Sequence, residues 1–204
     1  MAAAAELGLD GALRPVRGAL AMAEAAGRVG AEALVVSAQS ATEAALAGTV
    51  PVIAARSLRH VVDILRDRAQ ALPIPDPVAL VHTAAGDLAE VRGQPRARRA
   101  LEIAAAGAHN LLLIGPPGSG KTMLARRLTG IMTPPSHDEV LEITRIHSAA
   151  GLLAAGTRLD RRPFRAPHHT ASAAALVGNA RLRPGEITLA HPSVRECPSK
   201  AGAA

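Results

Sequence analysis

The chain has 204 residues, enough for one or two domains, and 49% of them are apolar, with alanine dominant and Phe164 as the only aromatic side chain. Its net charge of +6 comes almost wholly from arginine, because Lys121 and Lys200 are the only lysines. A single cysteine, Cys197, excludes an internal disulfide, and no apolar run approaches the roughly 20 residues that span a bilayer.

These features predict a cytoplasmic protein without a membrane segment. The first residues, 1–6, lack a basic stretch and reach an acid at once, so they do not resemble a signal peptide. The arginine excess has two explanations. It favours a polyanionic partner such as DNA, because neutralised phosphates release counterions, and it also fits the coding bias of an alanine-rich, lysine-poor source.

Residues 1–72 alternate helix-like and strand-like stretches, which predicts an α/β layer. Strands are expected at 33–37 and 50–54. Helices are expected at 16–27, ended by Gly27, at 39–47, ended by Gly48, and at 57–71, capped by Ser57. Three prolines within residues 72–77 then remove backbone donors and disfavour helix. We therefore predict a linker at 73–86 between a domain of residues 1–72 and a domain of residues 87–204.

The second domain has a strand, a loop and a helix in sequence. A helix is expected from Pro95 to Ala106, stopped by Gly107, followed by a buried strand at 110–114 and a helix at 121–131 that packs through Met123, Leu124, Leu128 and Ile131. Pro134 and Pro135 end that helix. Residues 136–139, Ser-His-Asp-Glu, predict a capping box at the start of the next one.

The loop between this strand and helix matches G-x-x-x-x-G-K-[ST] completely, through Gly115, Pro116, Pro117, Gly118, Ser119, Gly120, Lys121 and Thr122. Glycines let several N–H groups point into one concavity, and the following helix directs its partial positive charge there. Lys121 would hold the β and γ phosphates and the Thr122 hydroxyl would ligate Mg²⁺. The motif predicts binding of ATP or ADP with Mg²⁺ as cofactor.

Four stretches in this order carry a family resemblance: residues 90–94 (EVRGQ), the 115–122 loop, 162–170 (RPFRAPHHT) and 183–191 (RPGEITLAH). Together they resemble the Mg-chelatase-like ATPases of the YifB/ComM type, which are AAA+ proteins of the helix-2-insert branch. Residues 7 to about 70 resemble the second half of the Lon-protease-like, ribosomal S5 domain 2-like domain that precedes the AAA+ module there.

The resemblance implies a partial S5 domain 2-like α/β layer followed by a ChlI-like P-loop module with three αβα layers. It implies a homo-oligomeric ring, a hexamer, and a DNA-related motor. Val91 and Gly93, with Gln94, would line the adenine pocket, and residues 180–186 would border a β-hairpin insert. Leu20 stands where the Lon protease has its catalytic lysine, so a scaffold or DNA-contacting role is expected for the first domain.

ATP hydrolysis in this class needs an apolar strand that ends in two acids. The resembling family has it directly after the 185–191 stretch, where residues 191–200 of this sequence read HPSVRECPSK. We expect a module truncated before this Walker B strand, with no catalytic residue assigned and Glu186 as the nearest acid to an apolar run. Two alternatives to a DNA-related ATPase are a hydrolysis-deficient interaction module and a Mg-chelatase subunit of tetrapyrrole synthesis, which the Lon-like segment disfavours.

Weaker candidates are His168 with His169, Cys197 and an arginine cluster. Adjacent histidines on a strand point to opposite faces, which favours a structural or interface role over a metal site. Cys197 lacks a paired base in the sequence, so an inert thiol is expected. The cluster consists of Arg158, Arg161, Arg162 and Arg165, and either stays solvated or contacts phosphate or a neighbouring subunit.

Overall fold

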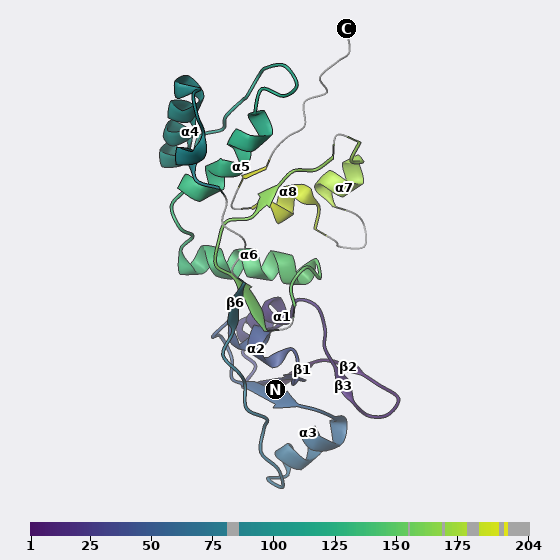
Figure 1. Ribbon diagram of the computed structural model, residues 1–204. Coiled ribbons are helices and arrows are strands. Elements are labelled where there is room, and N and C mark those ends of the chain that lie inside the picture. Colours follow the sequence, from purple (N-terminus) through teal and green to yellow (C-terminus); the bar gives the residue numbers. More distant parts are fainter. Residues whose placement is uncertain (81–85, 155, 169, 179–183, 192–193, 196–204) are drawn as a thin grey trace. The chain divides into compact units, whose positions relative to one another are not determined.

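A computed structural model of the chain is shown in Figure 1. It describes residues 1–80, 86–154, 156–168, 170–178, 184–191 and 194–195. The chain divides into two compact units: unit 1 is Met1–Leu80 with Val140–Leu159, and unit 2 is Val81–Glu139 with Asp160–Ala204. The predicted helix and strand types mostly agree with the structure, whereas several boundaries and one strand differ.

Unit 1 contains a parallel sheet in the order β1 (Ala2–Ala4), β4 (Leu34–Ser37) and β5 (Val52–Ala55). All four residues of β4 are buried, as expected of a strand covered on both faces. Leu34 and Val36 pack with the alanines of the first two helices, and Val35 packs with Val61 on the opposite face. The sheet is therefore the middle layer between helices. Strand β1 was not predicted, because its alanines have low strand propensity.

Three helices flank this sheet: α1 (Ala19–Arg28), α2 (Ala41–Ala45) and α3 (Leu58–Leu65) (Figure 1). The prediction that Gly27 ends α1 is wrong, because Gly27 lies inside the helix. A Cβ at this position would come within 2.8 Å of the Thr49 side chain. Ser57 caps α3 as predicted by accepting a hydrogen bond from the His60 N–H. The helix ends at Leu65, before the predicted 71, because Asp67 takes a left-handed conformation with φ 55°.

The remaining strands of unit 1 form two short pairs. Strands β2 (Glu6–Leu7) and β3 (Leu13–Arg14) are antiparallel, and β6 (Val78–Leu80) runs parallel to β7 (Thr157–Leu159). Strand β6 lies within the predicted linker. Helix α6 (His137–Ala149) brings Ser148 to unit 1, where its hydroxyl donates to Glu43 Oε1 at 2.5 Å and accepts from the Gly18 N–H at 3.1 Å.

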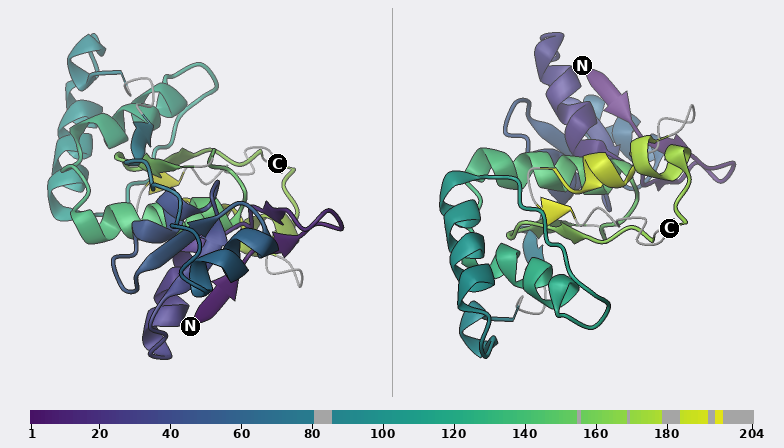
Figure 2. Two further views of the ribbon diagram at one scale, coloured as in Figure 1. Left: turned by 90° about the horizontal axis from the view of Figure 1, so that it is seen from below. Right: turned by 90° about the horizontal axis from the view of Figure 1, so that it is seen from above.

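Unit 2 is organised around two helices that pack against each other, α4 (Pro95–Gly107) and α5 (Lys121–Ile131) (Figure 2). Their core consists of Leu88, Val91, Leu101 and Leu124. The 3-10 helix η1 (Leu88–Glu90) precedes α4. Both predicted helices are confirmed, and proline stands at the start of α4 as predicted.

The remaining elements of unit 2 are short. Strand β8 (Phe164–Arg165) runs parallel to β9 (Val194–Arg195), and the short helices are α7 (Ala173–Val177) and α8 (Glu186–Leu189). Among the described residues of unit 2, β8 and β9 form the one strand pair.

The predicted buried strand at 110–114 is wrong for this structure. These residues form no strand, and the side chains of Leu112 and Ile114 are 79% and 86% exposed, while Leu113 packs at the edge of the α4–α5 core. A strand requires hydrogen-bonded neighbours, and no described residue pairs with this segment. Residues 110–114 therefore have the apolar composition of a buried strand, but no described strand pairs with them and buries them.

Candidate functional site

The glycine loop turns the chain sharply into the start of α5. Gly118 and Gly120 have φ of 79° and 83°, in the left-handed region that residues with a Cβ rarely adopt. The Ser119 N–H donates to the Pro116 carbonyl at 3.3 Å, and the Leu124 N–H donates to the Gly120 carbonyl at 2.9 Å. The glycines thus make the tight turn, and the helix begins directly at Lys121 as predicted.

The Lys121 side chain folds back over this loop. Its Nζ donates to the carbonyl oxygens of Gly115 and Pro116, both at 2.8 Å, and lies 3.3 Å from Ser119 Oγ. All three acceptors are neutral. The ammonium group is therefore held within the loop by contacts that an anion can replace without breaking an ion pair.

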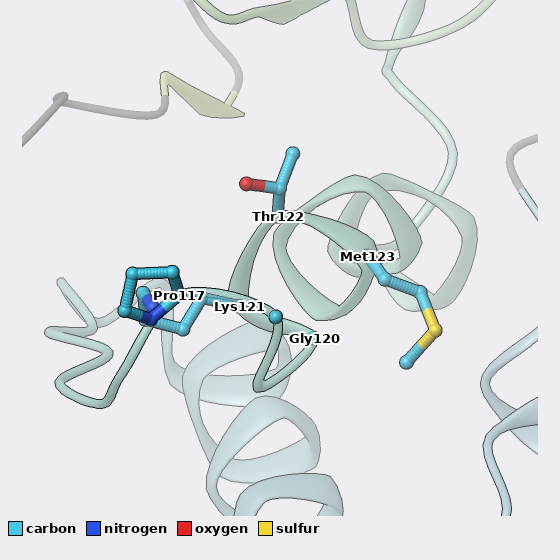
Figure 3. Close-up of a pocket in the computed structure, with 6 residues that line it drawn as sticks. Pro117, Gly120, Lys121, Thr122 and Met123 are labelled. Atoms are coloured by element: carbon cyan, nitrogen blue, oxygen red, sulfur yellow. The ribbon is translucent and has the colours of Figure 1, made fainter.

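An open pocket of about 360 Å³ lies at this loop, lined by Pro117, Gly118, Gly120, Lys121, Thr122 and Met123. In Figure 3 the Lys121 side chain runs toward Pro117, while Thr122 and Met123 project to different sides of the helix start. The pocket combines a positive side chain with the N-terminal end of an 11-residue helix. This donor set fits a phosphate group, and the Thr122 hydroxyl is the oxygen suited to a Mg²⁺ ion beside it.

The segment before α4 is tied to α5 by Arg127. Its Nη2 lies 2.9 Å from Glu90 Oε2, and its Nε donates to the Asp87 carbonyl at 3.2 Å. The Val91 side chain is 3% exposed and belongs to the α4–α5 core, whereas Gly93 is exposed with φ 71°. Contact of Val91 and Gly93 with adenine stays a prediction.

Sequence reasoning missed two contacts of this segment. The first is the Arg127 tie, which no local pattern indicates, because its partners lie 37 and 40 residues away. The second is the Gln94 side chain, whose Nε2 donates to the Ser119 carbonyl at 3.1 Å. The available signal for the second was the run Gly93-Gln94-Pro95, in which a glutamine stands between a glycine and a helix-starting proline.

Two members of the predicted arginine cluster are paired with acids inside unit 2. Arg162 Nη2 lies 2.8 Å from Glu139 Oε2, and Arg165 contacts both carboxylate oxygens of Glu186 at 2.7 and 2.5 Å. The Ser136 backbone N–H, followed by Arg162, lowers the pKa of Glu139, and the hydrogen bond to Glu186 raises the pKa of Arg165. Glu186 is thus engaged by an arginine at the start of α8.

Other predicted residues fall into three groups. Leu20 is fully buried in α1, which agrees with a structural role at that position. His168 Nδ1 lies 2.7 Å from Thr170 Oγ1, and His169, Cys197 and most of 180–186 lie outside the described residues. Within the described part of the chain, no helix is both long enough and apolar enough to cross a membrane.

Comparison with known proteins places the loop in a family. Residues 87–195, more than half of the chain, match the model of the family described as magnesium chelatase, subunit ChlI. The chain is 48% identical over 192 residues to a protein of Mycobacterium tuberculosis and 45% identical over 191 residues to protein YifB of Salmonella typhimurium, in both cases over 93% of this chain. It is 42% identical over 193 residues to competence protein ComM of Haemophilus influenzae, over 91% of this chain.

These alignments cover only 37–38% of the relatives' own lengths. They include both the glycine loop and the α/β unit that precedes it, since they extend over more than nine tenths of this chain. The family match begins at Asp87, the residue that caps η1, and runs to the end of β9. The chain therefore belongs to the magnesium chelatase subunit ChlI family and is a Mg-chelatase-like protein of the YifB/ComM type.

Proposed function

We propose that residues 87–195 form a nucleotide-binding module that holds ATP or ADP with Mg²⁺ at the glycine loop. The observation that carries this proposal is the Lys121 ammonium group, held by neutral oxygens within the loop at the N-terminal end of α5. A phosphate group that enters the pocket meets this charge and the helix dipole together. The complete loop motif and the family match support the same ligand.

Each residue of the loop has a separate task in this proposal. Gly118 and Gly120 allow the turn, Lys121 moves from carbonyl oxygens to the β and γ phosphates, and the Thr122 hydroxyl ligates Mg²⁺. When bound, Mg²⁺ supplies charge neutralisation for the phosphate oxygens. Adenine would lie near Gly93, on the segment that Arg127 ties to α5.

We further propose that the whole protein is an AAA+ ATPase and a DNA-related motor that works as a homo-oligomeric ring. The relative named competence protein ComM and the net charge of +6 support this role. Unit 1 would then correspond to the Lon-protease-like, S5 domain 2-like domain. Its parallel sheet between helices is compatible with that assignment.

Titration calorimetry with Mg-ATP and Mg-ADP tests the nucleotide site. We expect micromolar affinity, which corresponds to about 8 kcal/mol of binding free energy. Lys121→Ala should weaken binding roughly 10- to 150-fold, because it removes a charge-assisted contact worth about 1.5–3 kcal/mol. Arg126→Ala is the matched control, since Arg126 is an exposed cation on the same helix that does not line the pocket. Equal affinity of the wild-type and Lys121→Ala proteins would refute the assignment.

A further inference from the structure

We infer that Gln94 is a positioning residue for the phosphate cradle, because its side-chain amide sets the direction of the Gly120 N–H through the Ser119 carbonyl. This inference deepens the proposed nucleotide site and rests on it. Gln94 lies outside the glycine loop, 25 residues before Ser119, and does not line the pocket. Its contact with the loop is a hydrogen bond to a backbone carbonyl, so its effect on the cradle acts through the loop backbone.

The contact involves a single peptide plane. Gln94 Nε2 donates to the Ser119 carbonyl oxygen at 3.1 Å, and an added Cβ on Gly120 would lie 3.5 Å from the same nitrogen. In a trans peptide the carbonyl of one residue and the N–H of the next point in opposite directions. Holding the Ser119 carbonyl therefore fixes the Gly120 N–H on the side away from Gln94. Gly120 lines the pocket, so this N–H is a donor for a bound phosphate.

The loop is held at both ends by donors that engage its carbonyl oxygens. Lys121 holds the Gly115 and Pro116 carbonyls, and Gln94 holds the Ser119 carbonyl. A carbonyl oxygen that turned toward an anion would repel it, whereas an N–H attracts it. When a phosphate draws Lys121 away, the Gln94 contact still keeps the second end of the loop in the orientation that presents N–H groups.

The backbone of Gln94 supports a role for its side chain. Gln94 has φ 51°, a left-handed conformation that glycine adopts without strain and that is uncommon for other residues. Gly93 before it also has a positive φ, and Pro95 begins α4 directly after it. Arg127 anchors the same segment to α5 through Asp87 and Glu90. The Gln94 amide thus reaches the loop from a backbone segment that is anchored to α5, the helix that begins with Lys121.

Calorimetry on Gln94→Ala and Gln94→Glu tests the inference, with Mg-ATP and inorganic tripolyphosphate as probes. Loss of one neutral hydrogen bond should weaken binding of both probes about three- to tenfold in Gln94→Ala. Gln94→Glu keeps the length but replaces the donor with a charged acceptor, so its loss should be larger. Gln39→Ala is the control, because Gln39 is an exposed glutamine of unit 1. The Gly120 amide resonance should shift in both Gln94 variants while the melting temperature stays within a few degrees of the wild type.

The outcomes separate this inference from the proposed function. If Lys121→Ala loses binding but both Gln94 variants bind like the wild type, the nucleotide site stands and the role of Gln94 is refuted. If Gly120 keeps its resonance, or if both Gln94 variants unfold, Gln94 does not position the loop and the inference is likewise overturned. If the wild type does not bind Mg-ATP, the proposed function fails, and the inference fails with it.

Discussion

The cations of unit 2 differ in the kind of oxygen that holds them. Arg162 and Arg165 face the carboxylates of Glu139 and Glu186, and each pair neutralises its own charge. Lys121 contacts carbonyl and hydroxyl oxygens, and the ion pairs among the described residues do not include it. Its positive charge is therefore available to an anion, which distinguishes it from the paired arginines on physical grounds.

The capping box at the start of α6 predicts a pH dependence. The Ser136 N–H donates to Glu139 Oε2 at 2.8 Å, the Glu139 N–H lies 3.3 Å from Ser136 Oγ, and the pKa of Glu139 lies below its ordinary 4.5. Because the folded carboxyl holds its proton less tightly than the unfolded one, its stabilisation is present above pH 4.5 and is lost as pH falls through the folded pKa.

Glu139→Gln should therefore lower stability at pH 7 by about 1 kcal/mol or less, and the difference should disappear at low pH. Melting temperatures of the two proteins between pH 2 and pH 7, roughly the range over which a carboxyl titrates, measure this. Glu32→Gln, on an exposed acid of unit 1, is the control. A difference that stays constant over this range would show that the charge of Glu139 contributes nothing.

The elements that could be predicted are those with local causes. Helix α5 begins and ends at the predicted residues because the glycine turn and the apolar spacing act within one turn of the helix. The capping box is set by residues 136 and 139 alone. The predicted strand at 110–114 is wrong because a strand depends on neighbouring strands. The predicted end of α3 is wrong because the backbone at Asp67 is left-handed. The tie from Gln94 to Ser119 also lies beyond local reasoning.

Helix α6 predicts a further effect within unit 1. Ser148 is 5% exposed, donates to Glu43 and accepts from the Gly18 N–H, while Glu43 Oε1 also accepts from the Leu20 N–H at 3.0 Å. These contacts cap α1, whose N-cap Gly18 has no side chain to do so. Ser148→Ala should lower the free energy of unfolding by about 1–3 kcal/mol, because it leaves a buried N–H and a carboxylate oxygen without this partner.

Urea unfolding measures the effect of Ser148→Ala, with Thr133→Ala at an exposed position as control. The double variant with Glu43→Gln tests whether the two side chains act together. We expect its loss to be smaller than the sum of the two single losses, since both remove the same hydrogen bond. Additive losses would contradict the network.

The chain as a whole combines two units of different character. Unit 1 joins residues 140–159 to residues 1–80, because β7 pairs with β6 and Ser148 of α6 bonds to Glu43 and Gly18. The unit is therefore assembled from segments far apart in the sequence. Unit 2 carries the glycine loop on a core of two helices and η1. The sequence indicated an α/β layer followed by a phosphate loop, because helix and strand alternation and the loop motif are local patterns. The discontinuity of unit 1 has no such pattern.

Backbone hydrogen exchange with and without saturating Mg-ATP tests the nucleotide site, because it reports where the ligand binds. We expect slower exchange of the N–H groups of residues 118–122, all of which except Ser119 line the pocket, and no change in β4, which lies in unit 1. The protection of the loop should disappear in Lys121→Ala at the same ATP concentration. Unchanged exchange at residues 118–122, or equal protection in Lys121→Ala, would contradict a nucleotide site at this loop.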